Sequence, residues 1–169
     1  MMEEETMYLK KELTQNFLRI SQEHTLIYEY IEKLEKIINR QKHSKLFTKL
    51  KSIVLKLEND IYDHFILEER VFFPTTLLCI PSLETIDLVL KLQKEHGFLE
   101  RDMQKILDFI HDQPNKDQAI HEPLLAILRQ FVKILKDHAD EEINTLFPKL
   151  EADKKSNEVI KDLVKKFDS

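Results

Sequence analysis

The chain has 169 residues, of which 42% are hydrophobic and 34% charged, and its formal net charge is −5. Lysine and glutamate interleave along it without forming a basic stripe, so we expect no nucleic-acid partner. The acidic start MMEEETMYLKKEL is unlike a signal peptide, and no run reaches the about 20 apolar residues of a membrane span. We therefore expect a cytoplasmic protein with no membrane partner, and the single cysteine suits that reducing compartment.

The composition predicts an all-α fold. The chain contains one glycine, five prolines and no tryptophan, a balance that favours long amphipathic helices over turn-rich sheets. Its length suits one domain, residues 1–169. Apolar residues recur at helical spacing in five segments. These predicted helices cover about residues 6–40, 46–73, 82–112, 120–146 and 156–167.

The connections between the predicted helices are short. Residues 39–44 and 111–118 are polar and are predicted turns, and Ser82 is a predicted helix N-cap. Four long helices with short connections pack most simply as an antiparallel up-down-up-down four-helix bundle. The short C-terminal helix is expected to pack across that bundle. An internal pseudo-repeat is also predicted, because residues 6–80 resemble residues 81–150 in their pattern.

One motif occurs twice and dominates the pattern: His, then Glu four residues later, Phe nine later and Pro ten later. Its two copies are HFILEERVFFP at residues 64–74 and HADEEINTLFP at residues 138–148. Positions i and i+4 share one face of a helix, so His64 is paired with Glu68 and His138 with Glu142. Each copy therefore presents an imidazole and a carboxylate in one direction.

The Phe-Pro dipeptides at the end of both motifs predict helix boundaries. Proline donates no backbone hydrogen bond and disfavours helix in the residue before it. We expect the second helix to kink or stop near Phe73, with short helical turns up to Pro81. The fourth helix is expected to end in the same way at Phe147 and Pro148.

A lone histidine precedes each motif: His24 comes before the first and His96 before the second. Any one histidine on an apolar stripe is ordinarily a hydrogen-bonded core residue. Burying four imidazoles and two carboxylates together is costly unless something neutralises and coordinates them. The repeated pattern therefore predicts a metal centre in the bundle interior.

The ligand types limit the choice of metal. Without thiolates a cysteine-type zinc site or an iron-sulfur cluster is disfavoured, and mixed imidazole and carboxylate ligands suit iron or manganese, and zinc less specifically. If Glu68 and Glu142 both bridge, each of two metals receives two imidazoles and two carboxylates. An octahedral ion then keeps about two positions open for a solvent bridge and an exogenous ligand.

This ordered pattern resembles the hemerythrin-like family of HHE cation-binding domains, in a variant with four histidines and two glutamates, over about residues 6–150. The resemblance implies a non-haem di-iron centre, with an oxo or hydroxo bridge between two iron ions, that binds or reacts with O2, NO or peroxide. Manganese or zinc is a less favoured occupant. The implied metal ligands are His24, His64, Glu68, His96, His138 and Glu142.

The sequence departs from the oxygen-carrying hemerythrins, which are expected to show HxxxH on the third helix and a His followed by Asp five residues later near the fourth. Here the third helix has Glu100 four residues after His96, and the fourth uses Glu142. Glu100 is a candidate for a catalytic role, as an extra ligand, an acid that orients a ligand or a proton relay. The alternative is a carboxylate that turns away or pairs with a nearby base.

The variant is more similar to the branch of the family found in iron-sulfur cluster repair proteins and in iron- or oxygen-responsive domains. Two alternatives therefore stand beside small-molecule binding: an iron- or oxygen-responsive interaction module, and iron donation for cluster repair. Repair proteins typically add a small N-terminal domain with a cysteine pair, whereas this chain has one cysteine. We therefore expect the repair role to be the less favoured of the two.

Three kinds of neighbour complete the predicted site. Tyr28, four residues after His24, is a second catalytic candidate whose phenol could approach a metal or its bridge, or is an ordinary half-buried tyrosine. Gly97 suggests that a side chain there would crowd the pocket or a facing helix. Ligating imidazoles usually donate their second N–H to a carboxylate or carbonyl, so we expect one or two nearby acids to do this. The acids considered are Glu23, Glu69, Glu95 and Glu141.

Overall fold

The computed structural model describes residues 2–40, 46–112 and 119–169, apart from the side chains of residues 2–14 and 16. This part of the chain is helical and contains no strand, which confirms the all-α prediction. Its helices are α1 (Met2–Asn39), α2 (Leu46–Leu67), η1 (Glu68–Phe72), α3 (Phe73–Cys79), α4 (Leu83–Asp112), α5 (Glu122–Glu141), η2 (Glu142–Leu146), α6 (Phe147–Ala152) and α7 (Lys154–Asp168).

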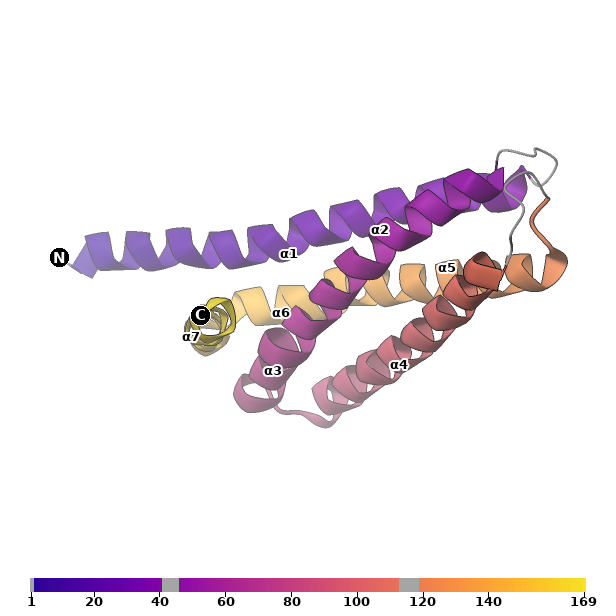
Figure 1. Cartoon of the computed structure of the whole chain (residues 1–169). Coiled ribbons are helices and arrows are strands. Elements are labelled where there is room, and N and C mark those ends of the chain that lie inside the picture. Colours follow the sequence, from indigo (N-terminus) through magenta and orange to yellow (C-terminus); the bar gives the residue numbers. More distant parts are fainter. Residues whose placement is uncertain (1, 41–45, 113–118) are drawn as a thin grey trace.

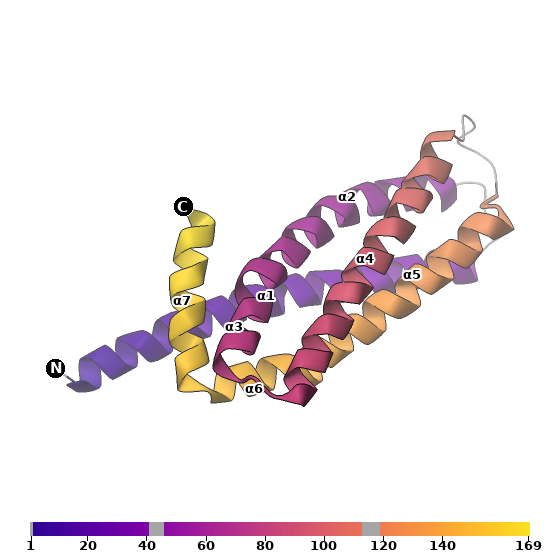
Figure 2. The same cartoon turned by 90° about the horizontal axis from the view of Figure 1, so that it is seen from below.

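The four long helices α1, α2, α4 and α5 form the predicted up-down-up-down bundle (Figure 1). Helix α1 packs against α2 and α5, and α4 packs against α5 and α2, so each helix has two neighbours. Helix α7 crosses one end of the bundle and contacts α1, η1, α3 and α6 (Figure 2). The Asp153 carboxylate caps α7 by accepting a 2.8 Å hydrogen bond from the Ser156 backbone N–H.

The bundle core consists of two apolar clusters with a polar layer between them. On α1 one cluster begins at Ile27 and the other ends at Ile20, and the same division recurs on α4 between Leu92 and Leu99. The six predicted metal ligands lie at this division. Each is exposed by 1% or less. Burying charged side chains in such a layer is costly unless they are paired or coordinate a metal, so the polar layer is the candidate functional site.

Of the two outcomes expected at Phe73, a kink or a stop, the stop is wrong, and so is the predicted end of the fourth helix at Phe147 and Pro148. The backbone continues through Phe73 and Phe147 in helical conformation, with φ/ψ of −65°/−48° and −64°/−39°. A π-helical turn precedes each dipeptide: the Phe73 N–H donates to the Glu68 carbonyl, five residues back, and the Phe147 N–H donates to the Glu142 carbonyl. The wider turn relieves the clash between a proline ring and the carbonyl four residues earlier, so the chain stays helical.

The other boundaries agree closely with the sequence analysis. Ser82 caps α4, since its Oγ accepts a 3.1 Å hydrogen bond from the Thr85 N–H, and its own N–H donates to Thr85 Oγ1 at 2.9 Å. The predicted short turns after Phe73 are the helix α3. The fourth helix begins at Glu122, two residues later than predicted. Most of the two predicted turns, residues 39–44 and 111–118, lies outside the described residues.

Gly97 does not make room for a neighbouring side chain, contrary to our expectation. A Cβ built on this residue would meet no heavy atom within 4 Å. The glycine lies in the middle of α4 and its φ is not positive, so neither crowding nor backbone conformation requires it. Its effect on the fold is therefore the ordinary entropic cost of glycine within a helix.

Replacing Gly97 with alanine is expected to stabilise the metal-free protein by about 1 kcal/mol, because alanine loses less backbone entropy on folding and meets open space here. For a chain of this size the gain corresponds to a rise in Tm of about 2–4 °C. Thermal unfolding followed by circular dichroism measures it. An unchanged or lower Tm would show that Gly97 has a role other than the one argued here.

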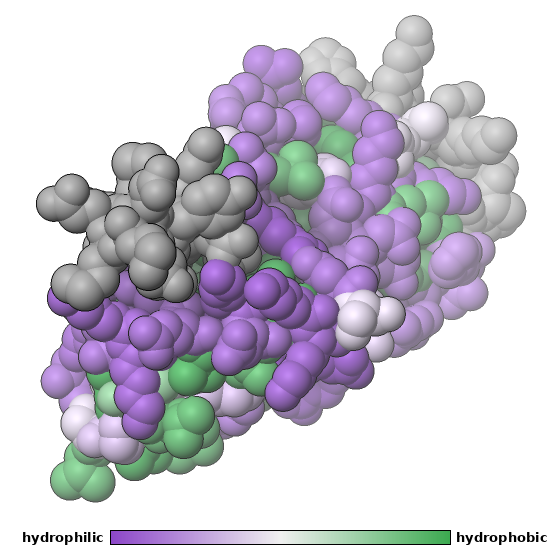
Figure 3. Space-filling view, turned by 90° about the vertical axis from the view of Figure 1, so that its left-hand side faces the viewer, coloured by the Kyte–Doolittle hydropathy of each residue, from purple (hydrophilic) through white to green (hydrophobic). Residues whose placement is uncertain are grey.

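The outer surface is mostly hydrophilic, with apolar side chains gathered toward one end of the face seen in Figure 3. Leu77, Leu78 and Leu83, near the connection from α3 to α4, are among the exposed apolar residues. Among the described residues no helix combines the length and the apolar character needed to cross a bilayer.

Candidate metal centre

The six predicted ligand residues converge at the middle of the bundle. They form two groups of four, and within each group one ligand atom per residue lies within 4.8 Å of the others. The two groups share Glu68 and Glu142 and differ in their histidines. The first adds His24 and His64, from α1 and α2, and the second adds His96 and His138, from α4 and α5.

The Glu68 carboxylate faces both groups at once. Its Oε1 lies 2.8 Å from His64 Nε2, and its Oε2 lies 3.1 Å from His96 Nε2. Each oxygen therefore belongs to a different histidine pair. This is the disposition that a carboxylate needs to bridge two ions.

The Glu142 carboxylate repeats this arrangement from the opposite motif. Its Oε2 lies 2.9 Å from His24 Nε2 and its Oε1 lies 3.2 Å from His138 Nε2. The α-helical i, i+4 spacing places each glutamate beside the histidine of its own motif, as predicted. Bundle packing then brings the lone histidines of α1 and α4 to the other carboxylate oxygens.

All four imidazoles are oriented by a hydrogen bond at the ring nitrogen that faces away from the centre. The partners are acceptors only, so each Nδ1–H donates, and Nε2 is the ring nitrogen that faces the centre. The four bonds are His24 to the Ile20 carbonyl at 2.8 Å, His64 to Glu23 at 2.9 Å, His96 to Glu69 at 2.7 Å and His138 to Glu95 at 3.0 Å. Three acids orient ligands, more than the one or two expected.

Aromatic rings enclose the centre. The His96 ring lies between Phe65 and Phe73, with ring centroids 3.8 and 5.4 Å away and nearly parallel planes. Phe147 meets His24 edge-on at 5.3 Å. Phe73 and Phe147 are the phenylalanines of the two Phe-Pro dipeptides, so this part of the motif forms walls of the site. Such apolar walls exclude water and strengthen electrostatic interactions inside.

The protein groups alone do not satisfy the polar atoms at the centre. Among the described residues, His64 Nε2, Glu68 Oε1 and Glu142 Oε1 are fully buried and have no hydrogen-bond partner, although His64 Nε2 and Glu68 Oε1 lie 2.8 Å apart. Buried polar atoms without partners are rare and call for an explanation, for which an ion is one of the usual ones. Nitrogen and oxygen donors converging on such a point fit a bound metal.

Comparison with known proteins identifies the family. The family model of the hemerythrin HHE cation binding domain matches residues 18–150, a range that contains all six residues. The chain belongs to this family. No curated protein and no solved structure matches it significantly. The hemerythrin-like fold is a helical bundle, in agreement with the structure.

Electrostatics in the metal-free hemerythrin-like site favour charged imidazoles. Burial opposes protonation of His64, but the negative charges of Glu68 and Glu142 and the hydrogen bond to Glu23 outweigh it and raise the pKa of His64 to about 10. Burial likewise opposes a charge on His138, but the Glu142 charge and the hydrogen bond to Glu95 raise the pKa of His138 well above its usual value. Burial would raise the pKa of Glu68, but the neighbouring imidazoles of His64, His138 and His96 hold it well below normal. The metal-free site therefore favours protonated His64 and His138.

The two catalytic candidates lie outside the two ligand groups. The half-buried Tyr28 hydroxyl donates to Asp140 on α5, and burial together with this hydrogen bond raises the pKa of Tyr28. Glu100 is exposed on α4 and forms no ion pair among the described residues. Glu141, the fourth acid considered, pairs with Lys91 at the surface instead of orienting a histidine.

Sequence analysis did not identify Phe65, Phe73 and Phe147 as walls of the site. For the last two a signal was present, because both follow their motif histidine by nine residues. Phe65 gave no such signal, since it is simply one of the apolar residues on its helix stripe. Its contact with His96 arises from the packing of α2 against α4.

Replacing Glu95 with glutamine is expected to weaken metal affinity about 10-fold or more, because the amide no longer supplies the negative charge that orients the His138 imidazole. Competition with a coloured chelator measures the affinity. Glu141→Gln is the matched control, since Glu141 adjoins Glu142 in the sequence but its side chain pairs with Lys91. Equal affinities for the two variants would contradict the orienting role of Glu95.

Proposed function

We propose that this hemerythrin-like chain holds two iron ions between its four histidines and two glutamates and that the centre binds or reacts with O2, NO or peroxide. The main observation behind the proposal is that the Glu68 and Glu142 carboxylates each offer one oxygen to each histidine pair. Imidazole nitrogen and carboxylate oxygen are ligands that suit iron. The chain would act as a cytoplasmic, non-haem, di-iron protein whose partner is a small molecule.

The four protein ligands available to each ion would leave an octahedral ion with about two open positions. An iron ion with open positions supplies redox chemistry and Lewis acidity to a small ligand. The protein residues would orient the imidazoles and exclude water. Three acids and one carbonyl hold the imidazoles in place, and the phenylalanine walls keep water away from the centre.

Iron analysis with visible and near-ultraviolet spectroscopy tests the proposal. Protein purified in air is expected to hold about two irons per chain and to show charge-transfer absorption that changes on addition of dithionite, O2 and NO. The variant His64→Ala with His138→Ala is expected to lose this iron. The matched control is His111→Ala with His121→Ala, which removes two exposed histidines. A folded protein that gains no iron would refute the proposal.

A second candidate function is an iron-responsive interaction module. It is favoured by the origin of the ligands, which come from all four long helices together with η1 and η2. A site assembled from so many segments couples metal binding to folding, so metal occupancy could control a surface that another protein binds. Light scattering and Tm with and without iron distinguish this function. A metal-free bundle of unchanged size and stability would exclude it.

A further inference from the structure

A pocket of about 450 Å³ lies between α2 and α4, beside the candidate metal centre. Its inner wall is apolar and is formed by Ile61, Phe65, Leu99, Met103 and Leu107. All five of these side chains are at least 92% buried, so the wall belongs to the bundle core. The pocket is therefore a hollow that reaches from the surface toward the interior.

The Phe65 side chain contacts both this pocket and the centre. Phe65 lines the pocket, and its ring also stacks on His96 with centroids 3.8 Å apart and meets the His138 ring at 5.7 Å. The ring is only 2% exposed, so it closes the inner end of the pocket. Rotation of Phe65 away from His96 would connect the pocket with the place where the histidines converge.

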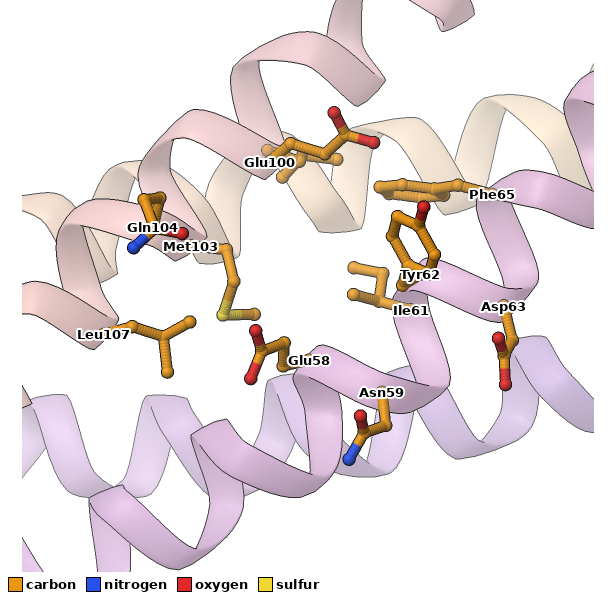
Figure 4. Close-up of a pocket in the computed structure, with 11 residues that line it drawn as sticks. Glu58, Asn59, Ile61, Tyr62, Asp63, Phe65, Glu100, Met103, Gln104 and Leu107 are labelled. Carbon is orange, nitrogen blue, oxygen red and sulfur yellow. The ribbon is translucent and has the colours of Figure 1, made fainter.

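The outer part of the pocket is acidic. Glu58, Asp63 and Glu100 line it, and lysine, arginine and histidine are absent from its lining. None of the three carboxylates forms an ion pair with another described residue, so their charges are not neutralised locally. In Figure 4, Glu100 projects from α4 on one side of the pocket and Glu58 from α2 on the other. An anion approaching the inner wall would pass these charges, whereas an uncharged molecule would not be repelled.

We propose that this pocket is the route by which small neutral molecules, of the size and polarity of O2 and NO, reach the metal centre, that its carboxylates exclude anions, and that Phe65 is the gate. The proposal rests on the proposed function for the presence of the metal. It also gives Glu100 a role at this position of α4: a negative charge at the mouth of the pocket, outside the ligand set.

Metal-free protein provides the first test. The chain contains no tryptophan, so Phe65→Trp places a single indole reporter at the gate. Its fluorescence is expected to be quenched several times more efficiently by dissolved O2 than by iodide. Adding Glu58→Gln and Glu100→Gln should raise iodide quenching about threefold at about 0.01 M ionic strength and leave no effect near 1 M, where the Debye length is about 3 Å. Asp63 is left unchanged because it adjoins His64.

The matched control for these charges is Glu151→Gln with Glu158→Gln, which removes two exposed acids from α6 and α7. It is expected to leave both quenching constants unchanged. Iodide quenching as efficient as O2 quenching would overturn the proposed selectivity. Iodide quenching that does not change when the two pocket carboxylates are replaced would also overturn it. An indole that O2 does not reach would overturn the route.

The unaltered chain provides a second measurement if Phe65→Trp fails to fold. Met103 lines the pocket and is the only methionine beyond residue 7. In protein labelled with ¹³C at the methionine methyl groups, xenon, which is neutral and apolar, is expected to shift the Met103 methyl signal strongly. A Met103 signal that xenon leaves unmoved would show that the pocket does not admit a neutral gas.

Iron-loaded protein tests the gate itself. Phe65→Leu and Phe65→Ala are expected to speed NO binding to the reduced protein and azide binding to the oxidised protein by about tenfold or more, as measured by stopped-flow absorption. The Glu58→Gln, Glu100→Gln variant should raise the ratio of the azide rate to the NO rate about threefold at low salt. Unchanged rates in both Phe65 variants would overturn the gate. Failure to load iron would count against the proposed function alone, because the metal-free tests still decide the pocket.

Discussion

Replacement of Glu68 with glutamine is expected to remove most of the iron that the proposed di-iron centre holds. The two Glu68 oxygens face different histidine pairs, and glutamine keeps only one oxygen and no charge, so it can no longer offer an oxygen to both proposed ion positions. Changing residues that only orient a ligand ordinarily costs about 10-fold to 100-fold in metal affinity, and loss of a shared ligand should exceed about 100-fold. Iron content after gel filtration and chelator competition give the two measures.

The control for this prediction is Glu69→Gln, an identical chemical change at the next residue. Glu69 does not face the centre but accepts the His96 Nδ1–H, so its loss is expected to weaken binding by no more than about 100-fold. If Glu68→Gln retained both irons while Glu69→Gln lost them, the proposed role of Glu68 as a bridging ligand would be wrong.

The gain in Tm on iron loading is expected to grow as the pH rises from about 6.5 toward 9. In the metal-free protein the pKa of His64 is raised to about 10, above its value of about 6.5 in an unfolded chain. Its contribution to stability is therefore complete below about pH 6.5 and is lost as the pH approaches 10. Over the whole interval the loss is on the order of 5 kcal/mol, because one pKa unit corresponds to about 1.4 kcal/mol.

The opposite end of the pH range depends on Glu68, whose pKa is lowered. Its contribution is present above its unfolded pKa and is lost as the pH falls below about 4.5, so the metal-free protein should be most stable between about pH 5 and 6.5. Iron requires neutral imidazoles, so binding near pH 7 should release protons from His64 and His138 and should strengthen with pH. A rise in pH therefore strengthens iron binding while it lowers the stability of the metal-free protein.

Differential scanning fluorimetry of metal-free and iron-loaded protein from pH 6 to pH 9 checks this prediction, with a pH indicator to count the released protons. His121→Gln is the control, because His121 is exposed and should not alter the slope. His64→Gln should flatten the pH dependence of the metal-free protein. A metal-free Tm that rises steadily between pH 6.5 and 9 would contradict the charge assignment at His64.

The sequence predicted those features of the site that depend on spacing within one helix. His64 and Glu68 are four residues apart, and that interval alone places them on one face. The lone histidines could also be predicted, because His24 and His96 lie on apolar stripes that must face the core. Helix order and direction followed from four long segments with short connections.

Contacts between helices could not be predicted in the same way. Glu23 precedes His24 but hydrogen-bonds His64, and Glu95 precedes His96 but hydrogen-bonds His138. Each acid therefore serves the histidine of the next long helix, not its own neighbour. Such pairs depend on how far one helix is rotated and shifted against another, which a single sequence does not specify. The residues that surround Glu100 could not be predicted for the same reason.

The π-helical turns were missed because periodicity analysis assumes 3.6 residues per turn throughout. Pro74 was expected to kink or stop the helix on sound local grounds, since it lacks an N–H. The chain remains helical because the turn before it is one residue wider, and Pro74 then lies in the first turn of α3, where proline is well accommodated.

These π-helical turns also fix the number of residues that the motif must contain between its glutamate and its phenylalanine. The backbone N–H of Phe73 closes the turn on the Glu68 carbonyl, while its ring covers His96 on another helix. A deletion or insertion of one residue between Glu68 and Phe73 would rotate the ring by about 100° around the helix axis and withdraw it from that histidine. The string H-x3-E-x4-F-P should therefore tolerate changes of side chain at its variable positions far better than any change in their number.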